Sequence, residues 1–210
     1  FFVSCYPKIV MDAIASHIHD ALTQVRELRR NILAKQRFKG YSGRARILSG
    51  SLALGAAALI QTLPPSKYTV LFGWLAVLAL GLFINYGALL YWFLFDPEVR
   101  RDVTKLKPVL RAVPSLAVGG VLTLAMLRSR IFWPLYGVWM TLFGLANLTG
   151  EDVLPSRILY VGLFYLVCGT VYLMSPSPTF LNPWPMGIVF FTGEWAAGLV
   201  MHFDREETQP

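Results

Sequence analysis

The chain has 210 residues, of which 55% are hydrophobic, 14% are aromatic and only 15% are charged. A soluble domain carries about 25% charged residues, so this composition and the repeated long apolar stretches exclude an ordinary soluble protein and indicate an integral membrane protein. The formal net charge of +7 comes without a base-reading motif or a basic stretch interleaved with aromatic residues, so we expect no nucleic-acid partner. Cys5 and Cys168 are the only cysteines, which excludes a disulfide framework.

The first ten residues are too short, and have the wrong flanks, for a cleaved signal peptide. We expect residues 1–10 to be a poorly ordered leader, or an extension ahead of a translation start at Met11.

An amphipathic helix is predicted over residues 11–38. Apolar side chains recur there every three or four residues and form what we call the helix-association stripe: Met11, Ile14, Ile18, Ala21, Val25, Leu28 and Ile32. This stripe has the minimum length for a coiled coil, and the basic faces beside it would equally suit a helix that lies on anionic lipid. Docking onto the protein's own membrane helices is a third option. Residues 38–46 form a basic, glycine-containing joint that completes this region, 11–46.

Six apolar segments follow, at about 47–63, 69–95, 113–128, 131–148, 158–175 and 184–203. We predict an all-α fold, in which a cytoplasmic amphipathic helix precedes a bundle of about six transmembrane helices over residues 47–203, with a polar tail at 204–210. A bilayer core needs about 20 helical residues, and several segments are shorter. A re-entrant hairpin over 113–148 is therefore the alternative to two spans.

The basic residues predict the orientation of these segments. Sixteen of the 19 Lys and Arg residues fall on the side of the N-terminus, so the positive-inside rule places both termini in the cytoplasm. Nine of them are predicted to form a basic band that contacts anionic lipid headgroups, the expected partner on this side: Arg37, Lys39, Arg44, Arg46, Arg100, Arg101, Lys105, Lys107 and Arg111.

Glu194 is a single carboxylate in the apolar run 186–203, where an ionisable group is costly and usually has a partner or a function. Asn85 lies 11 residues before Asp96, and Glu194 lies 10 residues before Asp204. With parallel helices the two side chains lie at nearly equal depth, so the pair is our candidate intramembrane polar site. Glu194 either handles a proton, a cation or a polar ligand group, or it is a protonated hydrogen-bonding link between helices.

The sequence predicts no metal, cofactor or catalytic residue. His17 and His19 point to different sides of a helix and have no third ligand nearby. No phosphate-binding loop, zinc-protease motif or nucleophile elbow occurs. His202 is about 12 Å from Glu194 along a helix, which is too far for both to act on one atom.

The pattern therefore favours a non-catalytic integral membrane protein, an accessory subunit, scaffold or sensor, whose N-terminal helix engages a partner or a second copy. The alternative is a small transporter or channel that uses Glu194 for proton or cation coupling. A membrane-embedded enzyme acting on lipid is the least favoured class.

Overall fold

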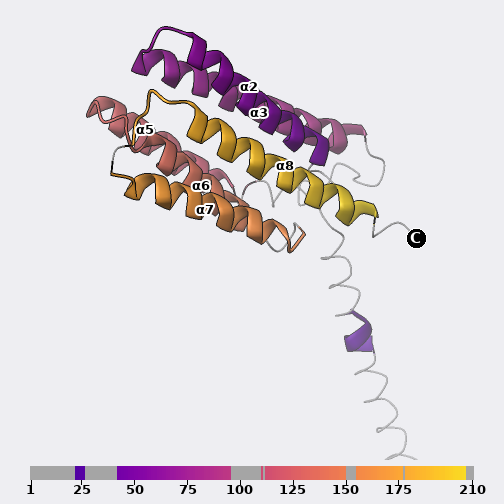
Figure 1. Cartoon of the computed structure of the whole chain (residues 1–210). Helices are drawn as coiled ribbons and strands as arrows, with labels where there is room; N and C mark the ends of the chain where they lie inside the picture. Colours follow the sequence, from indigo (N-terminus) through magenta and orange to yellow (C-terminus); the bar gives the residue numbers. More distant parts are fainter. Residues whose placement is uncertain are drawn as a thin grey trace, which may run out of the picture. The chain divides into compact units, whose positions relative to one another are not determined.

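A computed structural model describes residues 22–26, 42–95, 110, 112–149, 155–176 and 178–206, and helix is the only regular structure in these ranges. The helices of Figure 1 are α2 (Gly43–Thr62), α3 (Lys67–Phe95), α5 (Val113–Arg128), α6 (Leu135–Leu148), α7 (Ile158–Met174) and α8 (Trp184–Glu206). The all-α class is therefore confirmed for the part of the chain that the structure describes.

Contacts divide the chain into two units, residues 1–37 and 38–210. In the first unit, residues 22–26 are helical and exposed. The remainder of the predicted amphipathic helix lies outside the described residues, so its full length stays a prediction.

The helices of the second unit begin and end within four residues of the predicted apolar segments. Helix α2 starts at Gly43, four residues before the predicted segment. It starts there because the Ser42 hydroxyl accepts a hydrogen bond from the Ala45 N–H at 3.4 Å and caps the helix. Helix α6 starts at Leu135, four residues after the start of its predicted segment. Pro134 precedes it, and proline is suited to a helix start because it lacks an N–H.

Among the described residues, three helices are long and apolar enough to cross a membrane: α2, α3 and the portion Trp184–Phe203 of α8. The helices α5, α6 and α7 have 16, 14 and 17 residues. At 1.5 Å per residue they measure roughly 24, 21 and 26 Å, somewhat less than a hydrocarbon core of about 30 Å. Their lengths leave the number of membrane crossings a prediction.

Within the second unit, α8 lies between the α2–α3 pair and the group formed by α5, α6 and α7 (Figure 1). The closest pairs are α2 with α8 and α6 with α7, and both contain glycines at the crossing. A Cβ on Gly43 would lie 2.6 Å from the Gly198 carbonyl oxygen, and one on Gly144 would lie 2.8 Å from the Gly162 carbonyl oxygen. These helices therefore pack backbone to backbone, as small residues permit in membrane bundles.

The helix α3 contacts the opposite group through one buried aromatic cluster. The Trp74 indole N–H donates to the Tyr136 hydroxyl at 2.9 Å, and that hydroxyl donates to the Phe180 carbonyl oxygen at 3.0 Å. Tyr136 is fully buried. No Cα atoms of α3 and α5 come within 8 Å of each other in the described residues, and side chains of both helices line the cavity described below.

Candidate functional site

Glu194 on α8 forms a buried ion pair with Arg46 on α2. The Arg46 Nε donates to Glu194 Oε2 at 2.9 Å and its Nη2 donates to Oε1 at 2.7 Å. The two residues are 4% and 7% exposed. The paired, nearly parallel hydrogen bonds are the fork geometry that makes arginine a strong carboxylate partner.

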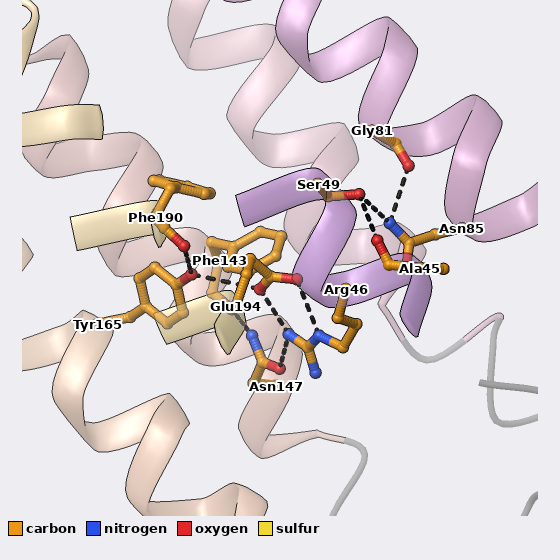
Figure 2. Close-up of polar contacts among 10 residues, drawn as sticks. All are labelled: Ala45, Arg46, Ser49, Gly81, Asn85, Phe143, Asn147, Tyr165, Phe190 and Glu194. Atoms are coloured by element: carbon orange, nitrogen blue, oxygen red, sulfur yellow. Dashed lines mark hydrogen bonds and ion pairs between the residues drawn. The ribbon is translucent and has the colours of Figure 1, made fainter. Parts of the chain in front are cut away.

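Two more helices hold this pair in place (Figure 2). Asn147 near the end of α6 accepts a hydrogen bond from Arg46 Nη2 at 2.8 Å, and its amide N–H donates to the Phe143 carbonyl oxygen at 2.9 Å. The Tyr165 hydroxyl of α7 donates to Glu194 Oε1 at 3.2 Å. The pair with its two supporting side chains, which we call the Arg46–Glu194 cluster, joins α2, α6, α7 and α8.

The close approach of α2 and α8 makes this cluster geometrically possible. A Cβ on Gly50 would lie 2.8 Å from the Glu194 Cβ, so a larger residue on α2 would push α8 away. Gly50 lies one turn after Arg46, and the glycine and the arginine together bring a cation beside the carboxylate. A buried charge without such a partner would be strongly destabilising.

Asn85 has a different partner from the one the sequence suggested. Its amide N–H donates to the Ser49 hydroxyl at 2.8 Å and to the Gly81 carbonyl oxygen at 2.9 Å, on the α3 side of α2 (Figure 2). Equal depth in the membrane puts two residues at the same height along the bundle, but it does not decide which way each side chain points around its helix. Glu194 therefore bonds to Arg46, while Asn85 and Glu194 share only the cavity described below.

Arg46 is a correction to the predicted basic band. Its side chain is buried in the bundle, so it does not reach a headgroup, and its charge is compensated by Glu194 instead. Arg44 is exposed, as a lipid contact requires. The other seven members of the band lie outside the described residues.

The helix-association stripe is described at one position only. Val25 is helical and 59% exposed within its own unit, so its predicted contact with a partner stays a prediction. The other six members of the stripe, including Leu28, lie outside the described residues.

A cavity of about 580 Å³ lies beside the cluster, between α2, α3 and α8 on one side and α5 and α6 on the other. Its wall is mostly apolar, with Leu78, Leu116 and Phe190 among the lining residues. Arg46 and Glu194 line it too. The volume falls in the range of about 300–1,000 Å³ that small-molecule sites occupy.

The polar groups of the cluster are engaged with one another. Both carboxylate oxygens of Glu194 already accept hydrogen bonds, and the described residues contain no group of three metal-ligating side chains. Sequence reasoning missed Arg46, Asn147 and Tyr165 as partners of Glu194. The sequence did offer one indication of Arg46 as a partner. Arg46 directly precedes an apolar run, and a buried carboxylate is stable only beside a cation.

No known protein family, curated protein or solved structure matches this chain. The site must therefore be interpreted from its own geometry.

Proposed function

We propose that the protein is a non-catalytic integral membrane protein with about six transmembrane helices, acting as an accessory subunit, scaffold or sensor. The observation that carries this proposal is the Arg46–Glu194 cluster. The Glu194 carboxylate accepts hydrogen bonds from side chains of α2 and α7, and Asn147 of α6 holds Arg46 in turn, so the cluster serves to hold the bundle together.

The membrane placement is supported by the three long apolar helices and by the outward side chains. Large apolar residues are exposed on several helices, for example Phe83 on α3 at 77%, Leu124 on α5 at 69% and Val167 on α7 at 61%. Exposed apolar side chains on so many helices are unusual for a soluble protein, whereas lipid tails would cover them. The distribution of basic residues supports a cytoplasmic location for both termini.

A small transporter or channel is the second candidate, and the cavity beside Glu194 favours it. Known transporter sites use polar groups that bind and release an ion or substrate near the middle of the membrane. Here the carboxylate is occupied by Arg46 and most of the cavity wall is apolar, so the scaffold function has the better support.

The scaffold function requires the N-terminal helix to engage a partner or a second copy through the helix-association stripe. We expect Val25→Lys and Leu28→Lys each to lower crosslinking between copies, or to a partner, because a cation would enter an apolar seam. Gln24→Lys is the matched control, since Gln24 is exposed and lies beside the stripe. Chemical crosslinking in membranes and sizing of the purified protein measure the effect. Unchanged crosslinking in both stripe variants would contradict a coiled-coil contact.

A further inference from the structure

Most of the polar side chains that line the cavity form hydrogen bonds or an ion pair within the protein. The Thr123 hydroxyl donates to the Gly119 carbonyl oxygen at 2.7 Å and accepts from the Trp139 indole N–H at 2.8 Å. The charges of Arg46 and Glu194 compensate each other. The wall therefore carries no net charge from this pair.

Three polar atoms of the cavity have no such partner. The Ser49 hydroxyl donates its single hydrogen to the Ala45 carbonyl oxygen at 2.9 Å, so Asn85 must present its N–H to Ser49. The Asn85 Oδ1 then accepts no hydrogen bond from any described residue. The hydroxyls of Tyr86 and Ser115, which line the same cavity, also form no hydrogen bond within the described part of the chain.

The remainder of the cavity suits a hydrocarbon chain and is accessible from the side of the bundle. Two of its apolar lining residues, Leu78 on α3 and Leu124 on α5, are 47% and 69% exposed. A molecule in the bilayer could therefore enter between these two helices. Asn85, Tyr86 and Ser115 are half-buried. Polar atoms without partners are costly where water is absent, so a ligand that satisfies them gains both affinity and orientation.

We propose that this cavity binds an electrically neutral lipid with a hydroxyl-bearing head, of the acylglycerol type. Its chain would lie along the apolar wall between α3 and α5. A hydroxyl of the head would donate to Asn85 Oδ1, and the hydroxyls of Tyr86 and Ser115 would donate to its oxygen atoms. A charged headgroup is disfavoured because the wall offers it no uncompensated counter-charge. The inference rests on the membrane placement proposed above.

The test uses a monoacylglycerol with a brominated chain, added to the full-length protein in nanodiscs. Bromine quenches tryptophan fluorescence at short range, and Trp74 and Trp139 both line the cavity. We expect saturable quenching that Tyr86→Phe with Ser115→Ala weakens about tenfold, because two hydrogen bonds of ordinary strength are lost. These hydroxyls form no hydrogen bond with another described residue, so we expect their removal to leave the fold intact. Tyr160→Phe is the matched control, since Tyr160 is 70% exposed and lies outside the cavity.

A second pair of variants tests the cavity itself. A side chain at Gly120 would enter open space in the cavity wall, whereas one at Gly87 would enter open space elsewhere. Gly120→Leu should abolish the saturable quenching and Gly87→Leu should not. Equal quenching by a brominated fatty acid methyl ester, stronger quenching by a brominated anionic lipid, or no effect of Gly120→Leu would each overturn the proposal. Release of the protein from membranes by alkali would instead refute the membrane placement.

Discussion

At the scale of single residues, we expect the Arg46–Glu194 pair to contribute strongly to the stability of the bundle. The pair is buried, and removing one partner leaves the other charge uncompensated in a medium that solvates it poorly. Glu194→Leu should therefore lower the free energy of unfolding by about 3–5 kcal/mol, whereas Arg46→Leu combined with Glu194→Leu should restore much of that loss. Thermal unfolding of the purified variants in one detergent measures both effects. Equal destabilisation by the single and the double substitution would contradict a coupled pair.

The same residue separates the two candidate functions. If Glu194 only holds helices together, any proton or cation flux into liposomes should be indistinguishable between the wild-type protein and Glu194→Gln, once both are shown to be folded. A specific loss of flux in Glu194→Gln would instead support the transporter. Asn85→Leu is an informative companion variant because Asn85 lines the cavity but does not contact the pair.

At the scale of elements, backbone contact between α6 and α7 depends on residues without side chains. A Cβ at Gly144 would lie 2.8 Å from the Gly162 carbonyl oxygen and 3.0 Å from the Leu166 nitrogen. Backbone atoms cannot move aside as a flexible side chain can, so the helices would have to separate.

Gly144→Leu should therefore destabilise the protein by at least the roughly 1–3 kcal/mol that overpacking costs. Gly55→Leu is the control, because a Cβ at Gly55 meets no atom within 4 Å, and leucine there should gain helix propensity of about 0.8 kcal/mol. Resistance to thermal unfolding in detergent would rank the two variants on opposite sides of the wild-type protein. A Gly144→Leu protein as stable as wild type would show that α6 and α7 are less closely packed.

At the scale of the whole molecule, the six helices and the basic residues predict a specific topology. Ser129 between α5 and α6 should face the outside, and Ser156 before α7 should face the cytoplasm. Both residues are exposed, so each can be changed to cysteine in a background in which Cys5 and Cys168 are serine. A membrane-impermeant thiol reagent added to intact cells should label Ser129→Cys but not Ser156→Cys. Labelling of Ser156→Cys alone would invert the topology, and labelling of both or neither would contradict a membrane crossing by α6, the helix that lies between the two positions.

The sequence alone predicted the helices of the second unit that the structure describes, and it singled out Glu194 as a candidate site residue. Apolar runs of this length admit few structures other than helices in a membrane, and breaks such as Pro64-Pro65 end them clearly. A lone carboxylate in such a run is conspicuous because burying a charge is costly.

Only the tertiary structure decided which side chains meet. Counting residues along a helix gives the depth of Asn85 and Glu194, but the rotation of each helix and the choice of neighbouring helices decide their contacts. Arg46 shows the same limit, because its long side chain extends into the bundle once glycines allow α2 and α8 to approach. The cavity, with three polar atoms that find no partner in the described part of the chain, is likewise a product of helix packing. Hydrophobic periodicity specifies each helix separately, whereas contacts across helices depend on the geometry of all of them together.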